Sequence, residues 1–401
     1  MTATAPRARR QQDIRRRNLA AALHAVADGG PLSRAAVAGR IGLTRAAVST
    51  LVDELLSAGL LVEQGPGRSG AVGRPGSALA LSDRGLCGIG AEIGVDHLAV
   101  CAVDLRGTVR ARASVGAANR GSTPEPVADA LSALVAQVTR EAGGQGLEAA
   151  GVCVTVPGLV RRESTTVVRA PNLGWEDVDL APLLPAPRLG LRADNEANLG
   201  ALAEMWLGVH RPAPRDVLHV SAEIGIGAAV LVNGGLLRGV RGFAGELGHV
   251  PVRPDGRLCE CGGRGCLEQY AGEEAVLRAS GLDPDRVARD HRGPGARTEL
   301  LASLAAAGDA ATRRALHDAG AALGIALAGA VSLLDPSAVV LGGALARLAP
   351  WLLPTAQAEL ARRMTGEPPL TVSALGRDGP LLGAAHSVVR SVLDDPLLHR
   401  C

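Results

Sequence analysis

Apolar residues recur at helical spacing through the first 60 positions of the chain. One such segment ends at Gly29-Gly30, a second runs from Ser33 to Gly42, and a third begins at Thr44. Ser and Thr are favoured helix N-caps, and Gly readily adopts the backbone that ends a helix. The pattern therefore predicts three helices. The third is expected to be amphipathic, with its apolar face formed by Val48, Leu51, Val52, Leu55 and Leu56.

Two short helices joined by a tight Gly turn are typical of a helix-turn-helix, whose second helix enters the major groove of DNA. After residue 59 come two strand-like segments around a tip rich in Gly and Arg, the pattern of a wing. We predict a winged helix-turn-helix DNA-binding domain over residues 1–83; a helical protein-binding module is the alternative. The Arg-rich stretch before residue 18 is expected to be flexible or to cap the first helix. The predicted DNA contacts are Thr44, Arg45, Ala46, Ser49, Thr50 and, at the tip, Arg68 and Arg74.

The rest of the chain repeats one pattern twice: three consecutive strand-like segments followed by helical segments. The first copy starts near residue 85 and the second near residue 216. This duplication predicts an α/β fold with two lobes and a cleft between them. Lobe one is expected to span about 84–196 together with the C-terminal helix at about 380–401, and lobe two about 197–379. Other helices are expected near 124–142 and over 296–335.

The net charge of +2 conceals a division along the chain. Residues 1–85 hold twelve Arg and six acidic residues, a balance of +6, whereas the remainder has a balance of −4. A basic head on a mildly acidic body favours a polyanionic partner for the head. Every basic residue is Arg, so a Walker-type phosphate loop, which requires Lys, is excluded.

Three of the seven Cys lie close together, and the others are scattered, mostly in apolar segments. This distribution argues against a disulfide framework and favours a reducing compartment. The N-terminal segment lacks the apolar core of a signal peptide. The longest apolar run, residues 319–334, is shorter than the ~20 residues that a membrane span needs. We therefore expect a cytoplasmic protein without a membrane partner.

The clustered Cys follow a His with the spacing H-x9-C-x-C-x4-C. Thiolates and imidazole suit zinc, and four protein ligands make a closed structural site with no open position for catalysis. A redox pair or unrelated free thiols are the alternatives. The predicted ligands are His249, Cys259, Cys261 and Cys266.

Acidic and amide residues surround this loop. Glu246 and Glu268 flank it, and the segments "RAPNLGW" and "ADNEANLG" lie upstream. Carboxylates and carboxamides suit a polyol, because each hydroxyl both donates and accepts a hydrogen bond. Each acid alone could equally be a solvated charge. Two Gly-x-Gly pairs, at Gly88 and Gly225, are weak signs of a nucleotide site, and a strand rather than a helix follows the second.

The chain resembles the ROK family (repressors, open reading frames, kinases), in particular its regulators of the xylose-repressor and N-acetylglucosamine-repressor type. The resemblance rests on "GFAGELGHV", "CECGGRGCLEQYAG", "PNLGW", "DNEAN" and "VVLGGALA". It implies an actin/hexokinase-like, duplicated ribonuclease H-like sugar-binding domain that is usually oligomeric. It also implies structural zinc on the four ligands above. The sugar contacts that it implies are Asn172, Asn195, Glu246, His249 and Glu268, with Glu196 beside them.

The departures from the family's kinases are equally informative. Those kinases carry Asn-Asp-Ala-Asn with the Asp as general base, whereas this chain has Glu196 at that position. A longer side chain displaces the carboxylate by about an ångström, which is enough to damage catalysis. Both phosphate loops have lost their Thr and gained acids at Asp96 and Glu223, which are expected to repel phosphate. Only Gly342-Gly343 resembles the family's adenosine loop, and it could equally be a strand-to-helix turn.

We therefore predict a sugar-responsive regulator and not an enzyme. It is expected to be a repressor of carbohydrate-utilisation genes that binds a double-stranded DNA operator as a homo-oligomer, a dimer or a tetramer. The alternatives are an ATP-dependent, glucokinase-like sugar kinase and a module that binds a sugar phosphate or a protein.

Overall fold

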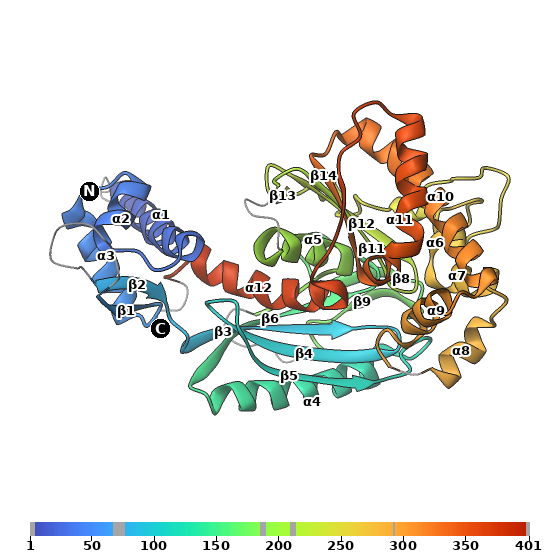
Figure 1. Ribbon diagram of the computed structural model, residues 1–401. Coiled ribbons are helices and arrows are strands. Elements are labelled where there is room, and N and C mark those ends of the chain that lie inside the picture. The colour runs from blue at the N-terminus through green and yellow to red at the C-terminus, as the bar shows by residue number, and fades with distance from the viewer. Residues whose placement is uncertain (1–4, 67–76, 185–189, 209–213, 292, 398–401) are drawn as a thin grey trace.

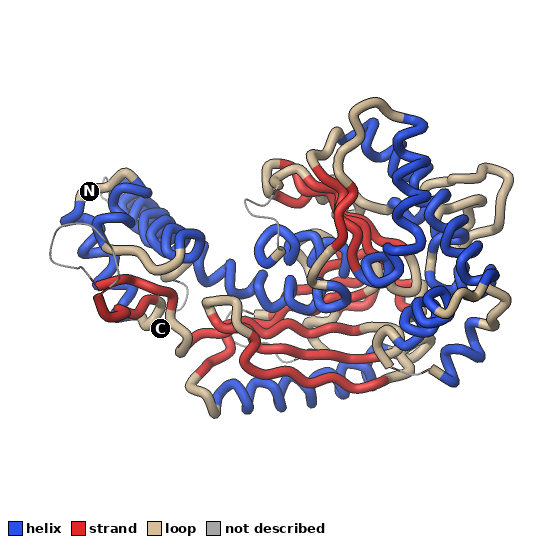
Figure 2. Tube along the Cα trace, in the orientation of Figure 1, coloured by secondary structure: helices blue, strands red, loops and turns tan. Residues whose placement is uncertain are grey.

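The computed structural model describes residues 5–66, 77–184, 190–208, 214–291 and 293–397. Figure 1 shows a small head at one end, followed by a larger α/β body. Two separate groups of strands form the centre of the body, and helices flank each of them (Figure 2). The C-terminal helix α12 (Gly379–Asp394) runs from the body toward the head.

The head is a winged helix-turn-helix. Its elements are α1 (Ala5–Gly29), α2 (Arg34–Ile41), α3 (Arg45–Ser57), β1 (Leu61–Pro66) and β2 (Ser77–Leu81). The predicted caps are confirmed: the hydroxyls of Ser33 and Thr44 accept hydrogen bonds from backbone amides at the start of α2 and α3. Gly42 ends α2 with φ of 69°, a left-handed conformation that Gly adopts easily. The antiparallel strands β1 and β2 form the wing.

The Arg-rich N-terminal stretch differs from the prediction of a flexible or helix-capping segment. Helix α1 is continuous from Ala5 and includes these arginines. Its later apolar residues, among them Leu19 and Leu23, are fully buried in the head. Arg is a good helix former, so a helix nucleated by this buried part extends readily through the basic residues.

The first sheet of the body has the strand order β10-β6-β3-β4-β5. Its strands are β3 (Gly85–Ile93), β4 (His97–Asp104), β5 (Val109–Gly116), β6 (Leu147–Val156) and β10 (Leu191–Asn195). Helix α4 (Pro124–Gly143) covers one face and α12 covers the other (Figure 1). A Cβ at Gly88 or Gly90 would collide with backbone carbonyls of α12. The first Gly-x-Gly pair therefore serves close helix-to-sheet packing.

The second sheet repeats this connectivity in the order β13-β12-β11-β14-β15. Its strands are β11 (Val217–Ala222), β12 (Ile226–Val232), β13 (Gly235–Leu236), β14 (Ala338–Gly342) and β15 (Leu370–Val372). In each sheet the first three strands in sequence, β3 to β5 or β11 to β13, form an antiparallel meander. Two further strands, β6 and β10 or β14 and β15, add in parallel next to the first strand of the meander. Helix α5 (Glu196–Leu207) contacts β11 and β12 and also packs on α12. The duplicated actin/hexokinase-like body is thus confirmed.

The predicted helix over 296–335 is two helices, α9 (Ala296–Ala306) and α10 (Ala310–Leu334). Gly308 has φ of 92°, and the Asp309 carboxylate caps α10 by accepting from the Thr312 amide at 2.7 Å. Among the described residues, α10 alone is a single helix long and apolar enough to cross a membrane. It packs against α11 (Gly343–Arg363), and 56% of its most apolar window is buried inside the protein, as in a core helix.

Shorter elements connect these units. A three-stranded antiparallel sheet packs against the core of the first sheet, and short helices border the second. They are β7 (Leu159–Val160), β8 (Thr166–Ala170), β9 (Trp175–Asp179), η1 (Leu247–His249), α6 (Glu268–Ala271), α7 (Glu273–Ala279), α8 (Pro284–Asp290) and η2 (Gly376–Asp378).

The core of the head is continuous with apolar residues of α12, including Val389 and Leu393. Ion pairs reinforce this junction, joining Arg16 to Asp395, His24 to Asp394 at 2.7 Å and Asp28 to Arg390 at 3.9 Å. Helix α12 therefore packs on the first sheet and on the head at once.

Candidate functional site

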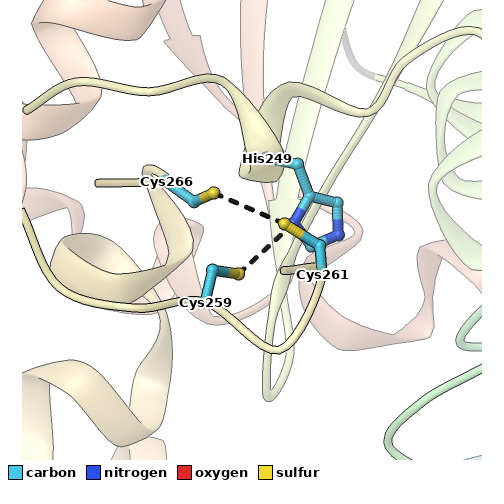
Figure 3. A group of neighbouring side chains, drawn as sticks. All are labelled: His249, Cys259, Cys261 and Cys266. Atoms are coloured by element: carbon cyan, nitrogen blue, oxygen red, sulfur yellow. Dashed lines mark hydrogen bonds between the residues drawn. The ribbon is translucent and has the colours of Figure 1, made fainter. Parts of the chain in front are cut away.

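One imidazole at the end of η1 and three thiols in the loop that follows it converge (Figure 3). Their ligand atoms lie within 4.8 Å of one another. Residues 249–267 are called the metal-binding loop. The Cys261 and Cys266 sulfurs are 3.6 Å apart, and the Cys259 sulfur is 3.6 Å from His249 Nδ1. A tetrahedral ion with bonds of about 2.3 Å to sulfur and 2.0 Å to nitrogen separates its ligands by about 3.5–3.8 Å. The predicted set, His249, Cys259, Cys261 and Cys266, can therefore hold one metal ion.

The loop backbone supports this arrangement. The Gly263 amide points at the Cys261 sulfur, 3.4 Å away, as expected beside a thiolate. A Cβ at Gly265, where φ is 72°, would collide with the Arg253 carbonyl, so the tight return of the loop requires Gly. Bridges between Pro251 and Cys266 and between Leu258 and Arg264 close the loop on itself.

One cavity between the two lobes is lined by all six residues predicted to bind a ligand. It is bordered on one side by β8, the following loop and the start of α5, and on the other by the start of β12 and the metal-binding loop. The predicted residues that line it are Asn172, Asn195, Glu196, Glu246, His249 and Glu268. Arg169 and Glu260, which the sequence analysis did not single out, also line it. The pocket thus combines two amides with several carboxylates from distant parts of the chain.

Asn195 is held firmly as the N-cap of α5. Its Oδ1 accepts from the amides of Ala197 at 2.8 Å and Asn198 at 3.4 Å, and its Nδ2 donates to the Gly158 carbonyl at 2.9 Å. Neighbouring Asp194 is buried and accepts from Asn198 Nδ2 at 2.8 Å. One N–H of the Asn195 amide is left for a ligand, so this residue contributes less to the pocket than its type alone suggests.

The motif around Asn172 is anchored by its apolar members. Leu173 and Trp175 are buried, and the Trp175 indole N–H donates to the Ser122 carbonyl at 2.8 Å. Asn172, between them and the cavity, is only partly buried. The local fold therefore presents the amide to the pocket by burying the residues that follow it.

Glu246, His249 and Glu268 form the opposite wall. Because His249 Nδ1 faces the thiols, Nε2 faces the pocket, 3.7 Å from a Glu246 carboxylate oxygen. A metal bound at Nδ1 leaves the proton on Nε2. The Glu268 carboxylate accepts from the Ile226 amide at 3.2 Å, which fixes its orientation. Burial raises the pKa of both Glu246 and Glu268, with His249 opposing the shift in each case.

Ion pairs lie at the sequence positions where the family's kinases have phosphate loops. Arg377 lies 2.6 Å from Glu223, and Arg297 bridges Asp96 at 3.4 Å and Glu273 at 2.9 Å. The sequence predicted that the carboxylates of Asp96 and Glu223 repel phosphate. In the structure each carboxylate is paired with an Arg from a distant part of the chain, so neither is a free negative charge.

Two further groups in this region carry shifted pKa values. Although burial opposes it, hydrogen bonding to Asp96 and Glu92 raises the pKa of His97 to about 10, so the imidazole is a cation that pairs with both acids. Burial raises the pKa of Glu196 to about 8, and the carboxylates of Glu223 and Glu92 add to the shift. The position corresponding to the kinase base thus holds a carboxyl that is mostly protonated at neutral pH.

Gly342 and Gly343, the pair that resembles the family's adenosine loop, have a structural explanation. Gly342 ends β14 and is the N-cap of α11, and a Cβ at Gly343 would collide with the Ala222 carbonyl. The pair forms a strand-to-helix turn against β11.

On the head, α3 exposes most of the residues predicted to contact DNA. Thr44, Arg45, Ala46 and Thr50 are exposed, and Ser49 is partly buried. Arg34 joins this helix to the wing, because its guanidinium donates to Asp53 at 2.6 Å and Glu63 at 3.1 Å. The predicted contacts Arg68 and Arg74 lie outside the described residues.

Comparisons with known proteins agree with this architecture. The xylose repressor of Bacillus spizizenii is 30% identical over 391 residues, which cover 96% of this chain and 98% of the repressor. A solved ROK family transcriptional regulator, a homolog of the E. coli MLC protein, has a TM-score of 0.77 over 96% of this chain and 98% of its own; at 24% identity the likeness concerns the fold alone. A ROK family glucokinase from Streptomyces griseus, solved with glucose and AMPPNP, has a TM-score of 0.63 at 27% identity, covering 75% of this chain and 98% of its own.

A model of the ROK family matches residues 88–390. That segment begins just after the wing and contains both sheets, the metal-binding loop and the whole lining of the pocket. By the match and by the architecture that it covers, the chain belongs to the ROK family.

Proposed function

We propose that this protein is a sugar-responsive transcriptional regulator that represses carbohydrate-utilisation genes. The observation that carries the proposal is the presence, in one chain, of a winged head and a polyol-type pocket, with ion pairs at the positions of the kinases' phosphate loops. The similarity to a xylose repressor along nearly the whole chain supports it.

Residues 1–83 would form the DNA-binding domain and residues 84–401 the sugar-binding domain, with lobe boundaries near 196 and 379. The heads of a homo-oligomer, a dimer or a tetramer, would bind a pseudopalindromic double-stranded operator in the cytoplasm. The N-terminal half of α3 would enter the major groove. A sugar between the lobes shifts operator binding only if it binds the DNA-free and DNA-bound arrangements with different affinity.

Zinc is the proposed metal, because it favours a tetrahedral set of thiolates and imidazole, and three thiols and one imidazole here lie within 4.8 Å of one another. Four protein ligands leave no open position, so its role would be structural. When bound, the ion supplies a crosslink that holds the loop; the protein's part is to orient His249 Nε2 and the loop carboxylates toward the sugar. Asn172, Glu246, His249 and Glu268 are the proposed principal sugar contacts, since their polar groups face the same cavity.

A sugar kinase is the second candidate, because glucokinases resemble the body and Glu196 keeps an acidic group near the pocket. Against it, the positions of the kinases' phosphate loops carry acidic residues that are paired with Arg, in the pairs Arg377–Glu223 and Arg297–Asp96. ATP-dependent phosphorylation of D-glucose or D-xylose by the purified protein would favour the kinase.

The decisive experiment is a gel shift on the DNA upstream of the protein's own gene and of sugar operons, titrated with D-xylose, D-glucose and N-acetyl-D-glucosamine. We expect one sugar to release the DNA. Glu268→Gln should require at least about ten times more sugar, since it loses a charge-assisted hydrogen bond worth about 1.5–3 kcal/mol, and should bind DNA normally. The exposed control Glu367→Gln should behave as the wild type. Release of the DNA by no sugar would argue against the proposal.

A further inference from the structure

Two charged side chains at the pocket have no role in the function described above. Arg169 lies on β8, and Glu260 lies between the metal ligands Cys259 and Cys261. Both are exposed, and both line the same cavity as the proposed sugar contacts. Within the described part of the chain, neither side chain makes a hydrogen bond or an ion pair.

These opposite charges belong to opposite lobes. The strand that carries Arg169 packs with the core of the first sheet, whereas the metal-binding loop that carries Glu260 borders the core of the second. Each is held on a fixed backbone: Arg169 is paired in register with β7 and β9, and Glu260 is flanked by two ligands of one metal site. A change in the angle between the lobes would therefore change the distance between the two charges.

Other opposite charges of the two lobes are already paired. Arg120 of the first lobe lies 2.7 Å from Glu274 of the second, and Arg297 reaches across to Asp96. Arg238 of the second lobe also lies 2.6 Å from Asp194 of the first. Among the described residues, Arg169 and Glu260 line the cavity beside the sugar residues without a partner of this kind.

We propose that Arg169 and Glu260 form an ion pair across the pocket when a sugar is bound and the lobes close, and that this latch sets sugar affinity. The inference rests on the proposed function. A sugar is neutral, so it satisfies hydrogen-bonding groups in the pocket without neutralising either charge. Closure excludes water from the pocket, which strengthens attraction between opposite charges. The latch stabilises only the closed form, so it favours the state that the sugar selects.

Charge reversal separates this latch from two simpler roles. Arg169 could pair with Glu176, its partner in the β8–β9 register, or each charge could contact the ligand by itself. In the latch, Arg169→Glu and Glu260→Arg each bring like charges together, and the double variant restores the attraction in the opposite sense. In the other two roles the double variant is no better than the worse single variant.

The measurement is isothermal titration calorimetry of the full chain with D-xylose, D-glucose and N-acetyl-D-glucosamine. We expect each single reversal to weaken binding of the sugar that the wild type recognises by about 3–10-fold, and the double reversal to return to within about twofold of the wild type. Arg161→Glu and Asp255→Arg, exposed reversals outside the pocket lining, should change affinity by less than twofold.

Zinc content and circular dichroism, measured on every variant, separate loss of the latch from loss of the loop. A double variant as weak as the worse single variant, or single variants with wild-type affinity, would overturn the latch while leaving the regulator intact. If the wild type binds none of the three sugars and no sugar releases the operator, the proposed function and the latch fall together.

Discussion

Asp194 is the buried carboxylate on which the start of α5 depends. It accepts from the Asn195 amide at 2.8 Å, from Asn198 Nδ2 at 2.8 Å and from the Arg238 guanidinium at 2.6 Å. Its side chain is 11% exposed and that of Arg238 is 30% exposed. Because Arg238 follows β13, this ion pair also links the two lobes.

Asp194→Ala leaves a mostly buried guanidinium and a buried amide without their acceptor. Breaking a buried pair in this way costs roughly 3–5 kcal/mol, and we expect about 3 kcal/mol here because Arg238 is partly exposed. Asp194→Asn keeps one oxygen acceptor but removes the charge, so a smaller loss of about 1–2 kcal/mol is expected. Both variants should also weaken sugar binding, since the cap formed by Asn195 loses its support.

Urea unfolding followed by circular dichroism measures these losses. The matched control is Glu299→Ala, which breaks an ion pair of similar length, 2.7 Å to Arg347, whose side chains are 58% and 48% exposed. Exposed pairs contribute about 0–1 kcal/mol, so this variant should be nearly as stable as the wild type. Equal losses for Asp194→Ala and Glu299→Ala would refute the argument that burial, and not the length of the ion pair, sets the cost.

Three further predictions concern the metal loop, the packing of α12 and the cleft. Cys266→Ser should lower the bound zinc, measured by mass spectrometry, from about one ion per chain to near zero. The control Cys101→Ser, at a buried Cys outside the cluster, should retain its zinc, and a fully loaded Cys266→Ser would contradict the ligand set. Gly88→Val should destabilise the protein by more than about 3 kcal/mol in thermal or urea unfolding, because the new side chain meets the α12 backbone. The control Gly116→Ala, where the added Cβ meets no atom within 4 Å, should change stability by less than about 1 kcal/mol. The pKa of His97 is raised from 6.5 to about 10, so the stability that it contributes is complete below pH 6.5 and is lost as the pH rises through 10. His97→Gln should flatten this decline, and an unchanged pH profile would show that the imidazole is not the group responsible.

Much of the architecture could be predicted from the chain itself, because its signals are local. The caps Ser33 and Thr44 mark the helices of the head, and the repeated meander marks the duplicated body. The break at Gly308 within an apolar Ala/Leu segment was missed, since the hydrophobic pattern continues across it. Short polar interruptions of this kind change the direction of a helix without changing the periodicity.

The residues that could not be predicted owe their roles to distant partners. Arg377 and Arg297 are ordinary charges in sequence, and only the fold brings them to Glu223 and Asp96, more than 150 residues away. The reverse holds for Asn195, whose residue type suggested a ligand contact but whose amide is largely used to cap a helix. Motif recognition finds residues that share a loop, whereas charge compensation across a cleft is visible only in three dimensions.

The shared packing of α12 has a consequence for how the protein is made. Synthesis proceeds from the N-terminus, and domains usually begin to fold in that order. Here, however, the head's hydrophobic core includes Val389 and Leu393, which are translated more than 300 residues after the wing. A nascent chain therefore exposes part of that core until α12 has left the ribosome. The head acquires its final stability only when the body has been synthesised, so a truncated polypeptide with a stable head and no body is disfavoured from the start.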